Sequence, residues 1–127
     1  MKIEVVTPQK AILSTDADEL VAPGVAGEFG ILPGHTPFVS ALKPGVLVAR
    51  KGTKRQVYAV GAGYAEVDGH DKIVVLTQHA VAADDVDAAG AQKDLEEADR
   101  ALKDGKTEAA AQHDWAQARL DARNAPR

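Results

Sequence analysis

The chain has 127 residues, a formal net charge of −4 and no cysteine. Its length suits one compact domain, or one domain with an appendage, that folds without covalent cross-links. The composition excludes disulfides, thiolate chemistry and Cys-based zinc sites, and the acidic balance argues against a nucleic-acid partner.

No run approaches ~18 apolar residues, so we expect no segment to insert into a membrane. The start, M-K-I-E-V-V-T-P, lacks the character of a signal or transit peptide, which favours a cytoplasmic protein. Residues 1–83 hold as many acids as Lys and Arg, so the whole net charge falls in residues 84–127. Alanine also becomes dominant there, which indicates a domain boundary near Ala83.

Residues 1–83 predict eight to ten short strands separated by Pro and Gly turns. Residues 2–7 alternate as a strand, and residues 71–77 form the clearest buried strand. Residues 46–60 predict a hairpin that turns at Gly52 and has a basic tip. The tip either protects a sheet edge from mispairing or meets an anionic partner. This pattern favours an antiparallel sandwich or a flattened barrel.

The stretch G-E-F-G-I-L-P-G-H-T-P-F, residues 27–38, combines turn formers with four large apolar side chains that favour burial. We expect an ordered, irregular loop packed on the sheet, with Glu28 and His35 at its rim. Ordered loops that present polar groups are common contact surfaces. The alternative is a structural corner without a partner.

After Ala83 the apolar spacing changes to steps of three and four, which predicts helices over residues 85–103 and 107–124. Asp84 or Asp85 is a candidate N-cap for the first helix, and Thr107 for the second. The two helices should form an antiparallel hairpin held weakly by alanines. Trp115 is its single large anchor, and we expect it to pack on a leucine of the first helix.

The sequence shows no nucleophile elbow, no phosphate loop and no metal-ligand spacing among its four histidines. These residues favour an interaction protein over an enzyme. The alternatives are a free-standing β-sandwich binding module for a small ligand or peptide, and a small enzyme with an unrecognised spatial site.

The run G-E-F-G-I-L-P-G-H-T-P-F-V-S-A-L-K-P-G-V-L, residues 27–47, closely resembles the epsilon subunit of F-type ATP synthases. D-E-L-V-A-P-G, G-A-G-Y-A-E-V and I-V-V-L-T fit the same family. The resemblance implies a ten-stranded β-sandwich followed by a two-helix hairpin. It implies a non-catalytic central-stalk subunit that couples rotation of the c-subunit ring to gamma.

The resemblance also implies partners and a location. The expected partners are gamma, the polar loops of the c-ring, and the alpha–beta head when the helices extend and block ATP hydrolysis. The subunit would lie peripherally on the cytoplasmic face of the bacterial inner membrane. Glu28 falls on the position facing the ring loops and His35 on the turn near gamma, with Phe29 and Gly34 as further interface residues.

Some members of the family bind ATP through the hairpin, at a motif I/L-D-x-x-R-A. The matching stretch here is V-D-A-A-G-A, in which Asp87 and Ala91 fit but Gly90 replaces the arginine. The position of a second arginine holds Glu97, which would repel phosphate. Arg119 and Arg123 keep a suitable spacing, but we expect them to pair with the acidic first helix. We therefore expect no cofactor, and weak or absent ATP binding.

Overall fold

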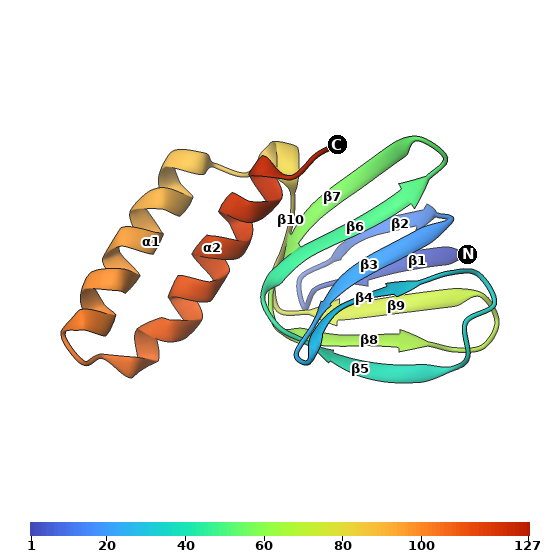
Figure 1. Ribbon diagram of the computed structural model, residues 1–127, viewed down its shortest axis with the longest axis horizontal. Helices are drawn as coiled ribbons and strands as arrows, with labels where there is room; N and C mark the ends of the chain where they lie inside the picture. Colours follow the sequence, from blue (N-terminus) through green and yellow to red (C-terminus); the bar gives the residue numbers. More distant parts are fainter.

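The computed structural model describes all 127 residues, as a β-rich unit followed by two helices (Figure 1). The strands are β1 (Lys2–Val6), β2 (Ala11–Asp16), β3 (Glu19–Gly24), β4 (Gly27–Ile31), β5 (Phe38–Leu42), β6 (Gly45–Lys51), β7 (Lys54–Val60), β8 (Gly63–Val67), β9 (Lys72–Thr77) and β10 (Ala80–Ala82). The helices are α1 (Ala88–Lys103) and α2 (Ala110–Asn124), each preceded by a 3₁₀ turn, η1 (Ala83–Asp85) and η2 (Thr107–Ala109). No helix is long and apolar enough to cross a membrane.

The ten strands form one sheet that folds over its own core, in the order β10-β7-β6-β3-β5-β8-β9-β1-β2, with β4 paired to β3. Neighbouring strands run antiparallel except β1 and β9, which are parallel. The predicted ten-stranded sandwich with a helical hairpin is confirmed. The hairpin of β6 and β7 turns at Gly52, as predicted, where the backbone adopts a φ of 59°.

Alternation along the strands places one apolar set inside the sheet, as the period of two requires. Ile3 and Val5 of β1 are fully buried, and so are Ile73 and Val75 (1% and 0% exposed) of its parallel neighbour β9. Leu20 and Leu47 bring β3 and β6 into the same cluster of 15 buried residues. This cluster contains no residue of either helix, so the sandwich has a core of its own.

Residues 27–38 differ from the expected continuous loop, because the first five of them form β4. Leu20 of β3 pairs with Ile31, which is fully buried, and Ala22 pairs with Phe29. Leu32 is 55% exposed, so the expectation that all four large apolar side chains are buried is wrong. Glycine lowers the intrinsic strand preference of G-E-F-G-I, but backbone pairing with β3 overrides it.

The helices begin later than the sequence patterns indicate. The N-cap of α1 is Asp87, whose carboxylate accepts a hydrogen bond from the backbone N–H of Gly90 at 3.1 Å; Asp84 and Asp85 lie in η1 instead. Thr107 makes no capping bond, and α2 follows η2 directly. The predicted stop after Lys103 is present, with Gly105 at a φ of 83°.

The hairpin packs on the sandwich through α2, while α1 packs on α2 and lies away from the sheet (Figure 1). Trp115 does not anchor on α1 as expected. Its indole stacks on the ring of His79, with 5.2 Å between centroids, and packs against the small cluster of Val57, Ala59, Ala83 and Ala122. Ala122 lies seven residues further along α2 and so shares the sheet-facing side of the helix.

Because the two apolar clusters are separate, we predict that residues 1–83 fold without the helices. The melting of this shorter chain, followed by circular dichroism, should stay cooperative. Its free energy of unfolding should fall by about 3 kcal/mol, the order expected for uncovering one or two valines beneath α2. Loss of a cooperative transition would show that the helices belong to the core.

Candidate functional site: an uncovered apolar row and the two ends of β4

Glu28 lies at the start of β4, opposite Pro23 of β3, and its side chain is exposed. It points to the outer face of the sheet, where it borders a shallow hollow of about 200 Å³ together with Val21, Val46 and Arg55. The Glu28 carboxylate makes no ion pair or side-chain hydrogen bond within the chain. It is therefore a free acceptor at the turn between β3 and β4.

The turn after β4 is ordered by its own contacts. Gly34 adopts a φ of 81°, and its N–H donates to the Asp71 carboxylate at 2.7 Å. The N–H of His35 donates to the Leu32 carbonyl at 3.2 Å, and the imidazole Nδ1 lies 2.8 Å from the Thr36 carbonyl oxygen. The turn thus holds an exposed imidazole in a defined place.

Phe29 and Phe38 connect this turn to the core. The His35 and Phe38 rings are 4.9 Å apart, and Phe38 meets Phe29 edge to face at 5.8 Å. Both phenylalanines are half-buried against the main cluster. Of the four predicted interface residues, Glu28 and His35 expose their side chains, Gly34 shapes the turn, and Phe29 supports it from below.

Glu28 lies at the start of β4 and His35 lies beyond its other end, so they do not form one rim as the sequence indicated. The turn of β3 and β4 carries Glu28, whereas the turn carrying His35 is tied to Asp71 at the start of β9. Each therefore lies on a different part of the surface.

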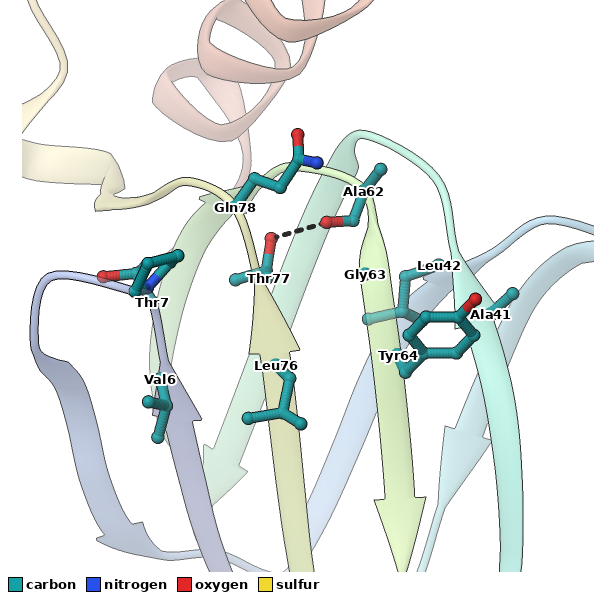
Figure 2. Close-up of a pocket in the computed structure, with 11 residues that line it drawn as sticks. Val6, Thr7, Ala41, Leu42, Ala62, Gly63, Tyr64, Leu76, Thr77 and Gln78 are labelled. Carbon is teal, nitrogen blue, oxygen red and sulfur yellow. Dashed lines mark hydrogen bonds between the residues drawn. The ribbon is translucent and has the colours of Figure 1, made fainter.

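A row of apolar side chains crosses four strands on the outer face of the sheet. Val6 of β1 is paired with Leu76 of β9, Leu76 with Tyr64 of β8, and Tyr64 with Ala41 of β5 (Figure 2). We call these four residues the apolar row. Tyr64 is 58% exposed and Leu76 51%, and Val39 beside the row is 65% exposed.

The apolar row borders a groove of about 640 Å³ that is closed at one end by Thr7, Gln78 and the turn at Ala62 (Figure 2). Thr77 is buried beside it and donates to the Gly61 carbonyl at 2.9 Å. Gly63 fits because a Cβ there would overlap the Leu76 carbonyl oxygen and lie 2.8 Å from the Thr77 Cα. The helices cover β6 and β7, so this face remains open.

Sequence reasoning missed the apolar row. Alternation alone shows that Tyr64 and Leu76 point away from buried Ala65 and Val75. That signal was present in the sequence, whereas the side-by-side placement depends on the pairing of β1, β9, β8 and β5.

Comparison with known proteins decides the family. The model of "ATP synthase, Delta/Epsilon chain, beta-sandwich domain" matches residues 1–83. The chain belongs to this family. Among its relatives, the ATP synthase epsilon chain of Geotalea uraniireducens is 47% identical over 103 residues, covering 81% of this chain and 74% of the relative. The Myxococcus xanthus epsilon chain is 43% identical over 103 residues, covering 81% and 75%.

Solved structures agree with this assignment. A chain of the Euglena gracilis mitochondrial ATP synthase, in an assembly of OSCP, F1 and c-ring, superposes with a TM-score of 0.71 at 25% identity. The match covers 94% of this chain and 74% of that one. A Tetrahymena thermophila chain shares the fold, with a TM-score of 0.59 at 16% identity, covering 84% and 96%. The epsilon-type chain is a non-catalytic stalk subunit of ATP synthase, and not an enzyme by itself.

The hairpin residues that match the nucleotide motif of some epsilon subunits already have internal partners. The Asp87 carboxylate caps α1, and Ala91 is fully buried. Arg119 donates from Nη2 to the Asp94 carboxylate at 2.8 Å, with its guanidinium 5.5 Å from the centre of the Trp115 ring. The predicted pairing of Arg119 with the acidic first helix is therefore present.

Arg123 differs from that expectation. Its Nη1 lies 3.5 Å from the Asp84 carbonyl oxygen in η1, and it makes no ion pair with an acid of α1. A second contact between the helices joins His113 Nε2 and the Asp99 carboxylate at 3.3 Å. The four candidate residues are thus brought to one hairpin, but not into one open pocket.

Proposed function

We propose that this chain couples rotation of the c-subunit ring to the gamma subunit in the central stalk of a proton-translocating ATP synthase. We further propose that its helices inhibit ATP hydrolysis when they extend toward the alpha–beta head. The observation that carries the first part is the open apolar row on a member of the epsilon family, whose structural neighbour lies in an ATP synthase assembly that includes the c-ring.

The apolar row is suited to gamma. Contiguous apolar patches on a folded chain mark sites of protein contact when nothing in the chain covers them. Tyr64 presents a large ring with a polar tip, a residue type enriched at the centres of interfaces. The turn of His35 lies at the far end of β5 from this groove and adds a polar group that donates or accepts at the edge of the contact.

Glu28 is suited to the c-ring. Its free carboxylate stands at an exposed turn, where it can accept hydrogen bonds from a polar loop. Its exposure supports a contact role rather than proton transport. The chain would then lie peripherally on the cytoplasmic face of the bacterial inner membrane.

The way the hairpin packs supports regulation by its helices. Only α2 rests on the sheet, and its buried residues are all alanines. Each alanine buries little surface, and Trp115 is the one large side chain of α2 that packs on the sandwich, so α2 binds the sheet less strongly than a leucine-rich helix would. Such a helix pair is suited to two arrangements, one folded on the sandwich and one extended.

A free-standing binding module remains the rival function, because the 640 Å³ groove is large enough for a small ligand or peptide. The two functions differ in what the groove contacts. A stalk subunit uses the row as a surface for gamma, whereas a module encloses a ligand in the groove. Co-purification with gamma from membranes favours the first and is not expected of the second.

We predict that Leu76→Asp weakens binding to gamma by about 10- to 100-fold, the range for losing one buried leucine contact of about 1.5–3 kcal/mol. The measurement is a pull-down of the full chain with gamma, followed by titration. Ala11→Asp, an apolar-to-acid change at an exposed residue of β2, is the control and should bind normally. Equal binding by both variants, with both folded, would remove the row from the interface.

We predict modest and additive effects for Glu28→Gln and His35→Ala on docking to a gamma–ring assembly. Each exposed contact contributes only ~0–1 kcal/mol, and residues at opposite ends of β4 do not share partners. The affinity loss of the double variant should therefore equal the product of the single losses. Unchanged affinity of the double variant, with an intact melting curve, would contradict the assignment.

We propose that the hairpin does not act as an ATP sensor, and we predict weak or absent MgATP binding there. Gly90 offers no side-chain donor to phosphate, while Asp87 and Arg119 are engaged by internal contacts. Calorimetric titration of the full chain tests this. Stoichiometric micromolar binding that disappears in the double variant Arg119→Gln, Arg123→Gln would show a working hairpin site.

A further inference from the structure

The two edges of the sheet leave a seam between β2 and β7. β10 covers β7 only along Tyr58–Val60, so residues 54–57 have no neighbouring strand on that side. A groove of about 540 Å³ lies in the seam, between Thr15 and Asp16 of β2 and the hairpin of β6 and β7. Arg127, beyond the end of α2, completes its wall.

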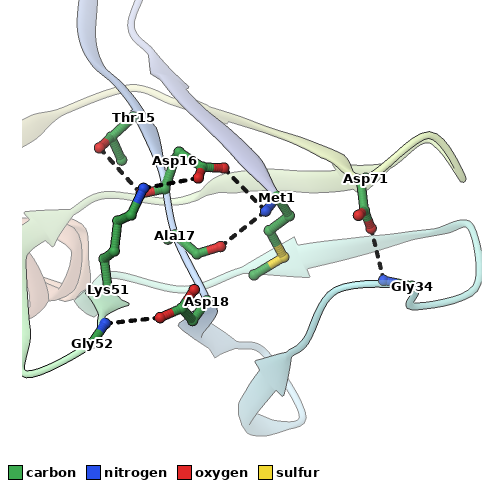
Figure 3. A network of polar contacts seen from close by, with 9 residues as sticks. All are labelled: Met1, Thr15, Asp16, Ala17, Asp18, Gly34, Lys51, Gly52 and Asp71. Carbon is green, nitrogen blue, oxygen red and sulfur yellow. Dashed lines mark hydrogen bonds and ion pairs between the residues drawn. The ribbon is translucent and has the colours of Figure 1, made fainter.

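The hairpin beside the groove carries two like-charged pairs. Arg50 lies directly opposite Arg55, and Lys51 directly opposite Lys54. Like charges in direct cross-strand pairs destabilise a sheet. Arg50 Nε reaches the Glu19 carboxylate at 3.4 Å. Figure 3 shows the second contact, in which Lys51 Nζ reaches the Asp16 carboxylate at 3.0 Å.

Lys54 and Arg55 have no acidic partner that offsets their charge. Neither side chain makes an ion pair or a hydrogen bond anywhere in the chain. Both line the groove, beside the hydroxyls of Thr15 and Thr53 and the amide of Gln56. As neighbouring residues of one strand they leave β7 on opposite faces, and Arg55 also borders the hollow beside Glu28. Both side chains have free donors and line the groove where the edge of β7 is open.

The other charges at the groove are already paired. The Asp16 carboxylate accepts a hydrogen bond from Lys51 and lies 3.1 Å from the N-terminal ammonium (Figure 3). These two contacts lower its pKa and keep it ionised. Arg127 Nη2 lies 2.8 Å from the Asp84 carboxylate and so contributes its charge from a fixed position. The unpaired charge of the groove is positive.

We propose that this groove binds a small anion that carries phosphate groups, with Lys54 and Arg55 as its direct contacts. The lining contains one apolar residue, Ala49, and no aromatic ring, so it offers charge and donors but nothing on which a base or an apolar side chain could pack. A guanidinium, an ammonium and two hydroxyls are suited to phosphate oxygens. The inference is independent of the function proposed above.

Phosphate chemistry can come from inorganic phosphate, from pyrophosphate or from the phosphate chain of a nucleotide. Calorimetric titration of the full chain with each, at constant ionic strength, separates these sources. We expect one pyrophosphate per chain, and ATP to bind similarly if its phosphate chain is what the groove recognises. That binding should be insensitive to Arg119→Gln, which lies in the hairpin.

The test variant is Lys54→Gln with Arg55→Gln, which should weaken pyrophosphate binding by at least tenfold. The matched control is Lys93→Gln with Lys103→Gln, which removes the same charge from exposed, unpaired lysines of α1 and should bind within twofold of the parent. Pyrophosphate should also raise the melting temperature of the parent and the control but not of the groove variant. Without ligand, the groove variant should melt no lower than the parent, because it loses like-charge repulsion.

Three results would overturn the proposal. They are the absence of pyrophosphate binding, an equal loss of binding in the groove variant and the control, and tighter binding of polyglutamate than of pyrophosphate. The last result would identify an acidic protein segment as the occupant of the seam.

Discussion

A sheet that folds over its own core forces every strand to divide its side chains between inside and outside. The parallel pairing of β1 with β9 joins the first strand of the chain to one of the last and fixes this division across the sandwich. The side chains on the inner face of the sheet form the main cluster. On the outer face, the strands differ in whether another element covers them. α2 covers β6 and β7, while the apolar row on β1, β9, β8 and β5 has no cover. The position of the uncovered apolar surface follows from that difference.

Much of the fold was predictable because local chemistry ends each element. Pro and Gly separate the strands, Gly52 turns the basic hairpin, and Gly105 stops α1. β4 was not, because its glycines disfavour a strand and it forms one only by pairing with the neighbouring strand β3. The apolar row was half predictable: alternation tells which side Leu76 occupies, but not which residue lies opposite. Trp115 was misassigned because a helical stripe identifies a buried side and not the element against which it packs.

The packing of α2 constrains any opening of the hairpin. Beneath it lie Val57 and Ala59, with Val46 and Val48 at the border of the same cluster. A departing α2 would expose these side chains to water, at a cost that its own small alanines do not recover. Opening therefore requires another surface that takes over part of the cover, or that binds the helices more strongly than the sheet does. The ion pair of Arg119 and Asp94 joins the two helices to each other and not to the sheet, so it does not oppose such an opening.

The seam shows how one set of charges can meet two requirements. Unpaired strand edges attract further strands, and lysines along an edge prevent this by resisting burial. The lysines of the basic hairpin protect the edge in this way, as the sequence predicts. Edge protection, however, does not require like charges to face each other across β6 and β7, since staggered lysines would serve as well at less cost. Direct opposition of Lys51 and Lys54 concentrates positive charge beside the hydroxyls of Thr15 in β2 and Thr53 in the turn. The proposed anion between the edges accounts for that placement better than protection of either edge alone.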